Sequence, residues 1–405
     1  MFDIDKIRQD FPILNTLIKG KRNTFLDTAA SAQKPKAVVD CMQKIYLEEY
    51  ANVHRGSYYL SEQITEKYEL SRKSIARFIN AKTEQEIIFT RSATEGINLI
   101  ASSWGLNNLK EGDEVLISRA EHHANLVTWQ QITKKTGATL VYFDLDKNGN
   151  FVLENFTEKL SPKTKLVATT AMSNVLGTVF PIDIICREAH KYGALVLVDA
   201  CQFAVHKKID VQTFDCDFLV FSGHKLYGPT GIGVLYAKYD LLLEIPPYQY
   251  GGDMITTVSY EDTKFAPPPA KFEAGTPAIV QAIGLGCAIN YLEQFNFEDI
   301  VDAEIKLTNY TTEQLLSVQG LTIYGLSPEK GGVFSFSIDG IHPQDLSFVL
   351  AQEGVAIRTG HFCAEPLVKS LGHNSLSRIS LGIYSSKEDI DILIKSIYKA
   401  KKLFS

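Results

Sequence analysis

The chain has 405 residues, of which 45% are hydrophobic and 22% are charged, and its formal net charge is −6. This length allows a large core and favours two domains, while the mild acidity gives no basis for binding nucleic acid or an anionic membrane. No apolar run approaches the ~20 residues of a membrane span, and the charged N-terminal segment does not read as a signal peptide.

The six cysteines lie at positions 41, 186, 201, 216, 287 and 363. None belongs to a C-x-x-C pair, and their spacing indicates neither a disulfide framework nor a zinc site. We therefore expect a reducing cytoplasm, with most of these thiols acting as small core residues. Cys363 differs from the others because it lies in a polar loop that contains glycine.

In chain order, the first segment of interest is NTFLDTAASAQKP at residues 23–35. It predicts a short strand followed by small residues, and Pro35 suits the start of a helix. Small residues at a strand end let a ligand approach the backbone, although tight helix–strand packing explains them equally well. In the loop at 51–62, His54 and Arg55 stand before a long predicted helix; such a pair is more often solvated than functional.

The next strands each end in a polar loop. A β-rich run ends at Thr90, and Ser92 and Thr94 then open a helix whose N-terminus can bind phosphate or is simply capped. The segment at 112–125 repeats the pattern and ends in two adjacent histidines, which do not face the same way. One of them can stack on an aromatic ligand and move protons. A later apolar run leads into a small polar loop that contains Asn174.

Two further strands end in ionisable groups. Asp199 directly follows the apolar run LVLV, where a carboxylate needs a cation or a donor, or else caps the next helix. In FSGHKLYGPTGIG at 221–233, Ser222, His224 and Lys225 lie between two predicted strands. A lysine at the carboxyl end of a strand can form a Schiff base with a carbonyl, or is merely solvated.

One kind of chemistry accounts for these groups together. A lysine for a Schiff base, a carboxylate for a pyridinium nitrogen, an imidazole to stack and a phosphate cup describe an enzyme that uses pyridoxal phosphate (PLP). Strands alternate with helices between residues 86 and 236, which is typical of an α/β protein. The chain lacks the G-x-x-x-x-G-K-[ST] motif, and no G-x-G-x-x-G motif follows a strand.

The motifs EHHAN, SNVLGT, LVDACQ, FSGHKLYGPTGIG, EAGTP and RTGHFCAEP occur in this order. Together they resemble the NifS-like cysteine desulfurases of the class V aminotransferase superfamily, specifically the SufS-type, group II branch that includes selenocysteine-lyase-like enzymes. The resemblance runs from about residue 20 to the C-terminus. It implies that L-cysteine is converted to L-alanine and that the sulfur is donated for iron–sulfur cluster assembly.

The resemblance also implies a role for each matching position. Lys225 would bind PLP covalently, Asp199 would pair with the pyridinium nitrogen, and His122 would stack on the ring and assist proton transfer. The other cofactor contacts would come from Gln202 and Asn174 at the phenolic oxygen, from Thr94, Ser222 and His224 at the phosphate, and from Thr276 of a second subunit. The substrate would be held by Arg378 at its carboxylate, with Arg358, Asn174, His54 and Arg55 near the same site.

Cys363 would provide the step that distinguishes a desulfurase. Its thiolate would attack the sulfur of bound cysteine and keep it as a persulfide; the alternative is an inert buried thiol. The group II loop usually reads R-x-G-H-H-C-A, and Phe362 replaces the second histidine here, which leaves the role of that position open. Cys201 stands where alanine is commoner and is interpreted as a packing variant.

His342 in IDGIHPQD matches a histidine of relatives that pass sulfur to a SufU-type, zinc-containing acceptor. There it can take a zinc-ligand place during docking. A surface histidine before Pro343 is an equally good interpretation, and a SufE-type acceptor is the competing partner. We expect no metal held by the chain alone.

The resemblance implies an α/β architecture of PLP-dependent fold type I, with a mainly parallel seven-stranded sheet and a smaller α+β domain. We expect the large domain at 21–290 and the small domain at 1–20 plus 291–405, where the strand at 332–338 alternates apolar and polar residues. The enzyme would be a cytoplasmic homodimer. The alternatives are a selenocysteine lyase or another class V PLP enzyme, and, in a different class, a non-catalytic sulfur-assembly scaffold.

Overall fold

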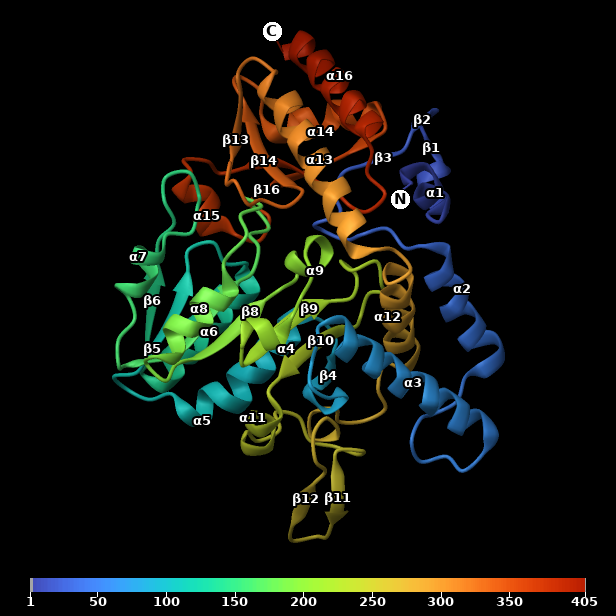
Figure 1. The fold of residues 1–405 in the computed structure, drawn as a ribbon, viewed down its shortest axis with the longest axis vertical. Helices are drawn as coiled ribbons and strands as arrows, with labels where there is room; N and C mark the ends of the chain where they lie inside the picture. The colour runs from blue at the N-terminus through green and yellow to red at the C-terminus, as the bar shows by residue number, and fades with distance from the viewer. Residues whose placement is uncertain (1–2, 405) are drawn as a thin grey trace.

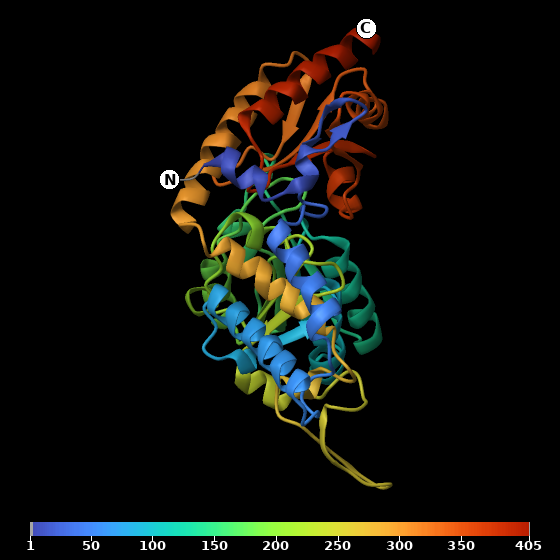
Figure 2. The ribbon, with the colours of Figure 1, turned by 90° about the vertical axis from the view of Figure 1, so that its right-hand side faces the viewer.

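The computed structural model describes residues 3–404, which form two lobes stacked along the long axis of the molecule (Figure 1). The larger lobe contains a seven-stranded sheet, and the smaller lobe contains a four-stranded antiparallel sheet. The C-terminus lies at the far end of the small lobe, and the N-terminal helix α1 (Ile4–Gln9) lies beside the same lobe (Figure 2).

The large sheet is mainly parallel, as the sequence predicted. Its strands in spatial order are β4 (Ile87–Thr90), β10 (Gly233–Ala237), β9 (Phe218–Ser222), β8 (Leu195–Asp199), β7 (Thr164–Thr170), β5 (Glu114–Ser118) and β6 (Thr139–Phe143). Only β10 runs against its neighbours, pairing antiparallel with β4 and with β9. The other pairings, from β9 to β6, are parallel.

The central strands read as continuous apolar runs because both faces of a parallel sheet are covered. In β8, Val196 and Val198 enter one hydrophobic cluster, while Leu197 between them enters the cluster on the other face. All five residues of β9 are buried. This burial on both sides explains why polar side chains occur only where these strands end.

The helices of the large lobe cover the sheet and its edges. They are α2 (Lys36–Lys44), α3 (Tyr59–Phe78), α4 (Ala93–Ile100), α5 (Leu106–Asn108), α6 (His123–Thr136), α7 (Leu153–Thr157), α8 (Ile182–His190), α9 (Phe203–His206), α10 (Val211–Phe214), α11 (Tyr239–Glu244) and α12 (Ile279–Leu292). Short 3₁₀ or π segments lie at Pro12–Asn15, Ile45–Glu49, Glu84–Glu86, Ala101–Gly105 and Ala270–Phe272. A hairpin of β11 (Ile255–Val258) and β12 (Thr263–Phe265) projects from the end opposite the small lobe (Figure 1).

The small lobe places helices against one antiparallel sheet. Its strands in spatial order are β13 (Leu321–Tyr324), β14 (Val333–Ile338), β17 (Leu376–Ser380) and β16 (Arg358–Gly360), and its helices are α13 (Phe297–Leu316), α14 (Pro343–Gln352), α15 (Glu365–Ser370) and α16 (Lys387–Phe404). The predicted strand at 332–338 is β14. The N-terminal segment adds the pair β1 (Leu17–Ile18) and β2 (Lys21–Arg22), as well as β3 (Thr24–Phe25), which pairs in parallel with β15 (Val355–Ala356). The domain boundaries stay a prediction, and β3 on the large-domain side of the predicted boundary pairs with a strand from the C-terminal part of the chain.

The cysteine analysis needs one correction. Cys41 in α2 and Cys287 in α12 form a disulfide, whereas the spacing of the cysteines gave no sign of a pair. The two positions are 246 residues apart, and only the packing of α2 against α12 brings them together. Cys186, Cys201 and Cys216 are free and buried, as expected of core thiols.

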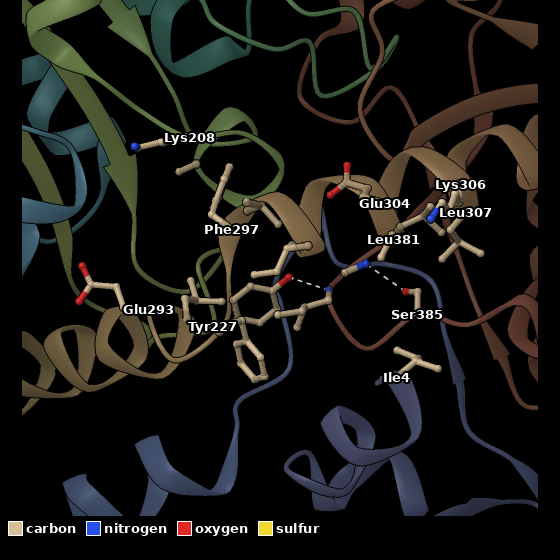
Figure 3. Close-up of a pocket in the computed structure, with 18 of the residues that line it drawn as sticks. Ile4, Lys208, Tyr227, Glu293, Phe297, Glu304, Lys306, Leu307, Leu381 and Ser385 are labelled. Carbon is tan, nitrogen blue, oxygen red and sulfur yellow. Dashed lines mark hydrogen bonds between the residues drawn. The ribbon is translucent and has the colours of Figure 1, made fainter. Parts of the chain in front are cut away.

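A cavity of about 790 Å³ lies where the lobes meet (Figure 3). Tyr227 lines it, and the Tyr227 hydroxyl accepts a hydrogen bond from the backbone N–H of Ile383 at 2.9 Å. The loop that carries Lys225 is therefore tied to the small lobe two residues further on. Among residues 3–404, none of the helices combines the length and hydrophobicity of a membrane span.

Candidate active site

The carboxyl ends of β7, β8 and β9 meet the small-lobe sheet around a second cavity, of about 260 Å³. Most of the predicted site residues line it, although they come from positions 94 to 378 of the chain: Thr94, His122, Asn174, Asp199, Gln202, Ser222, His224, Lys225, Arg358, Cys363 and Arg378. Parallel strands bring their carboxyl ends to one edge of a sheet, where open α/β folds bind ligands.

Asp199 is a buried carboxylate at the end of β8. Its Oδ1 accepts a hydrogen bond from the backbone N–H of Cys201 at 3.0 Å, and within residues 3–404 no cation forms an ion pair with it. Beside it, Gln202 donates from Nε2 to the Ala29 carbonyl at 2.9 Å, while its Oε1 is buried without a partner in the described chain. Buried groups of this kind need a ligand to complete them, and a protonated pyridine ring suits the Asp199 carboxylate.

Lys225 is held by the turn between β9 and β10. The N–H of Gly223 donates to the Ile232 carbonyl at 3.0 Å, and a Cβ at Gly223 would come within 2.9 Å of the Ile232 side chain. The carbonyl of His224 accepts hydrogen bonds from the Ala32 N–H and from the Lys34 ammonium, each at 3.0 Å. These contacts fix the peptide that precedes Lys225.

A phosphate-sized anion would meet donors at the edge of the same cavity. Thr94 lies in the first turn of α4, where free N–H groups and the helix dipole favour negative charge. Ser222 accepts a hydrogen bond on Oγ from the Ala93 N–H at 2.9 Å, so its hydroxyl proton remains available to an acceptor. Burial lowers the pKa of His224 to about 4, with a further contribution from Lys225. The chain therefore fits PLP at both its ring end and its phosphate end.

His122 lies at the N-terminus of α6. Its Nδ1 accepts a hydrogen bond from the Ala124 N–H at 3.1 Å, so the side chain caps the helix. Burial, and then the charge of Lys225, lowers the pKa of His122 to about 4. The imidazole is thus neutral near pH 7, with Nδ1 engaged as an acceptor and the proton on Nε2.

His122→Asn is expected to reduce the acid sensitivity of the PLP-free protein. In the unfolded chain His122 takes up a proton near its ordinary pKa of about 6.5, whereas in the folded chain it does so near 4. The unfolded state therefore binds more protons between these values, and the unfolding free energy falls as pH falls through this window, by up to about 3 kcal/mol. Asparagine keeps the helix cap but does not titrate, so urea unfolding at pH 7, 6 and 5 should show a shallower decline.

His190→Asn is the matched control, because a hydrogen bond to Asp217 raises the pKa of His190. The stability that His190 contributes is present at low pH and is lost as pH rises through the raised value. Removing it should therefore destabilise the acidic samples most. Equal acid slopes for His122→Asn and the wild type would contradict the neutral assignment of His122.

Arg378 and Arg358 share one carboxylate. Asp27 lies 3.4 Å from Nη2 of Arg378 and 3.1 Å from Nη2 of Arg358. Arg378 also donates from Nη1 to the Asn174 carbonyl at 3.0 Å, and its Nε is buried without a partner in the described chain. Burial lowers the pKa of Arg378 to about 10, so the guanidinium is charged at neutral pH. Asp27 was not among the predicted site residues, although it is the last residue of the short strand predicted at Phe25–Asp27.

The loop of Cys363 is fixed by its backbone, while Cys363 is exposed and borders the cavity. Phe362 and Cys363 both adopt left-handed conformations, with φ of 54° and 55°. Asn174 donates to the Phe362 carbonyl at 2.7 Å, and the His123 N–H donates to the Cys363 carbonyl at 2.6 Å. The His123 ring also accepts from the Glu365 N–H at 3.0 Å. Cys363 is exposed, unlike the buried thiol considered as its alternative.

Sequence reasoning missed His123. The sequence assigns a role to only one of the two histidines of EHHAN, whereas the second one, His123, holds the Cys363 loop. The signal that could have found it is its position next to His122. His122 caps α6 and lines the cavity, and the next residue contacts the loop that follows β16. The two rings lie 6.4 Å apart, which is no metal-binding arrangement.

Four predicted residues do not line the cavity of their own chain. His54 contacts Glu69 at 3.0 Å, and Arg55 pairs with Asp253 at 2.8 Å. Thr276 is exposed, and the exposed His342 caps α14 through Nδ1, which accepts from the Gln344 N–H at 3.3 Å. Their roles at a subunit interface or with an acceptor stay predictions.

Residues 24–393 match the model of the family described as aminotransferase class-V. The chain belongs to the class-V aminotransferase family. Enzymes of this family use PLP, in agreement with the cavity around Lys225 and Asp199.

Similar curated proteins align with nearly the whole length of this chain. It is 46% identical over 402 residues to a probable cysteine desulfurase of Synechocystis sp., covering 98% of this chain and 96% of the relative. It is also 46% identical over 400 residues to a probable cysteine desulfurase of Halalkalibacterium halodurans, covering 98% of both.

Solved structures agree in fold. The cysteine desulfurase CsdA from Escherichia coli superposes with a TM-score of 0.93 at 35% identity, covering 100% of both chains. A cysteine desulfurase from Thermococcus onnurineus superposes with a TM-score of 0.94 at 38% identity, covering 98% of both. The class-V fold with its seven-stranded sheet is thereby confirmed.

Proposed function

We propose that this chain is a PLP-dependent L-cysteine desulfurase that holds the abstracted sulfur as a persulfide on Cys363. The observation that carries the proposal is the placement of an exposed cysteine thiol on the same cavity as Lys225, Asp199 and a buried arginine. A transaminase needs the lysine, the carboxylate and the arginine, but it has no use for a nucleophilic thiol.

The chain supplies binding, orientation and a nucleophile. Bound PLP would supply an electron sink that weakens bonds at the α- and β-carbons of the substrate. Arg378 would bind the substrate carboxylate, because a guanidinium edge matches two carboxylate oxygens. Lys225 would hold the cofactor, and Asp199 would keep the pyridine nitrogen protonated.

Sulfur transfer would take place at Cys363. Its thiolate attacks the sulfur atom of the substrate, so that a sulfur–sulfur bond forms as the carbon–sulfur bond breaks. The electron pair of the broken bond stays with the carbon skeleton, which takes up a proton and leaves as L-alanine. Neutral His122 can hold and move a proton on the cofactor face. An acceptor thiol then removes the outer sulfur.

The test of this function is product analysis of the PLP-loaded protein with L-cysteine and a reductant. Equal amounts of L-alanine and sulfide are expected, and without the reductant alanine should form in an amount close to that of Cys363, with one sulfur retained on its peptide. A requirement for a 2-oxo acid would instead indicate transamination. Activity confined to selenocysteine would indicate a selenocysteine lyase, and a protein unable to take up PLP would indicate a scaffold.

We also propose the cellular setting that the resemblance implies. The protein would be a cytoplasmic homodimer of the SUF system, giving sulfur for iron–sulfur cluster assembly. Its subunit interface would bring Thr276, His54 and Arg55 to the neighbouring site; Thr276 is exposed and the Arg55 side chain is 66% exposed in the single chain. The Cys41–Cys287 disulfide removes part of the basis for a reducing compartment, but the proposed chemistry requires a reduced Cys363.

The acceptor is proposed to be of the SufU type, with SufE-type exchange as the alternative. His342→Ala would also remove the cap of α14, so His342→Asn is the better variant because asparagine caps helices well. We expect basal turnover to survive in His342→Asn while stimulation by a zinc-containing acceptor falls several-fold, since the ring nitrogen Nε2 is lost. Alanine production measured with each acceptor separately decides this, and equal stimulation of both proteins would remove the zinc-ligand role.

A further inference from the structure

Phe362 occupies the position where the group II pattern has a histidine, and its ring is buried while the neighbouring Cys363 is exposed. The Phe362 side chain belongs to the main hydrophobic cluster, and the residue is only 7% exposed. The ring also lines the active-site cavity. Its orientation follows from the backbone, because two consecutive left-handed residues reverse the direction of the chain at this point.

The buried ring lies against Arg378. The guanidinium carbon of Arg378 is 4.8 Å from the centre of the Phe362 ring, within the range of a cation–π contact. Arg378 is almost fully buried, at 2% exposure, and it shares its carboxylate partner Asp27, at 3.4 Å, with Arg358. A cation in such a site gains most from an aromatic face, because water cannot compete for it.

Arg378, Phe362 and Asn174 each contact the other two. Asn174 accepts from Arg378 on its backbone carbonyl at 3.0 Å and donates from its side chain to the Phe362 carbonyl at 2.7 Å. The Phe362 ring completes the set by contacting Arg378. The arginine that would bind the substrate carboxylate and the loop that carries the thiol are therefore joined through one residue next to Cys363.

We propose that Phe362 is a positioning residue for the substrate: its ring supports the Arg378 guanidinium and sets the edge that receives the carboxylate of L-cysteine. This inference rests on the proposed function. A phenyl ring carries no charge at any pH, whereas a protonated imidazole at this position would place a second cation against Arg378 and near Arg358. Phe362 therefore acts on substrate binding, through Arg378, and takes no part in the bond-breaking step.

The test is a series of fluorinated phenylalanines at position 362, which weaken the π face step by step and keep the shape of the ring. With one, two and three fluorine atoms, KM for L-cysteine should rise progressively, to about tenfold for the trifluoro ring, while kcat changes less than twofold. The dissociation constant of L-alanine, followed by the absorbance of bound PLP, should rise in parallel. The same substitutions at Phe156, a buried ring in an aromatic cluster that no cation of residues 3–404 contacts, should leave both constants unchanged.

Phe362→Leu and Phe362→Tyr complete the design. Leucine should raise KM at least as much as the trifluoro ring and should speed hydrogen exchange of the 361–365 backbone in the PLP-free protein, whereas tyrosine keeps a π face and should restore most of the affinity. Constant KM and L-alanine affinity along the fluorinated series would overturn the proposal, even if leucine has an effect, because shape alone would then matter. A fall in kcat at constant KM would overturn it too. A wild-type protein that binds L-alanine but makes none from L-cysteine would instead refute the proposed function.

Discussion

Cys363→Ala is expected to lose alanine and sulfide formation from L-cysteine by at least about a hundredfold, because the variant lacks the thiol that is proposed to accept the sulfur. Cys363 is the exposed one of the four free cysteines in the described chain. Its loop is held by backbone contacts from Asn174 and His123, so removal of the thiol leaves the loop geometry in place. The PLP absorbance and the affinity for L-alanine should therefore match those of the wild type.

Cys201→Ala is the matched control for this prediction. Cys201 lines the same cavity, but burial, together with the nearby Asp199 carboxylate, raises the pKa of its thiol to about 12. A thiol in that state is protonated at neutral pH and is a poor nucleophile. The variant should keep its activity within about twofold of the wild type. Substantial desulfuration by Cys363→Ala, or loss of desulfuration in Cys201→Ala, would contradict the assignment of the persulfide to Cys363.

Lys225→Ala is expected to abolish turnover and the covalent attachment of PLP. No other lysine lines the cavity in the described chain, and the turn after β9 aims residue 225 at it. The residues that would contact the phosphate and the ring remain, so PLP should still bind but should be removed by dialysis, at a rate followed by absorbance. The loss of activity should be about a thousandfold or more, as for other residues that bond covalently to a reacting group.

Lys34→Met tests whether PLP is attached to Lys225 or to the amine of the nearby Lys34. Burial lowers the pKa of Lys34 to about 8, which makes it a competing candidate for reaction with an aldehyde. Its ammonium, however, is engaged by the carbonyls of Ala32 and His224. Lys34→Met should keep PLP bound covalently, and borohydride reduction followed by peptide mapping should locate the label on Lys225. A label on Lys34 in the wild type would reverse the assignment.

The sequence predicted the ligand edge of the fold well, because the chemistry there follows from local order along the chain. Apolar runs buried on both faces ended in Asp199, Ser222 and the loop of Lys225, and parallel strands carry such ends to one edge. Cys363 could be singled out because a polar loop containing glycine is a poor place for a core thiol. The α/β class and the seven-stranded sheet followed from the alternation of strands and helices and from the resemblance.

Only the tertiary structure shows which residues far apart in the sequence contact one another. Asp27 pairs with Arg358 and Arg378, more than three hundred positions away, and the disulfide joins Cys41 to Cys287. Such pairs depend on how elements distant in sequence pack, and no local pattern records that.

The position of Phe362 shows the same limit most clearly. In sequence it was a departure from a familiar motif, with no role to assign. Whether its ring faces the solvent or Arg378 is decided by two left-handed residues and by a hydrogen bond from Asn174, 188 residues earlier in the chain. The sequence by itself predicted that a lysine and a carboxylate would meet at the end of a sheet, and the resemblance added the thiol of Cys363. The folded chain decided how the Cys363 loop and Arg378 support each other, because side-chain direction depends on backbone conformation and on contacts across the two lobes.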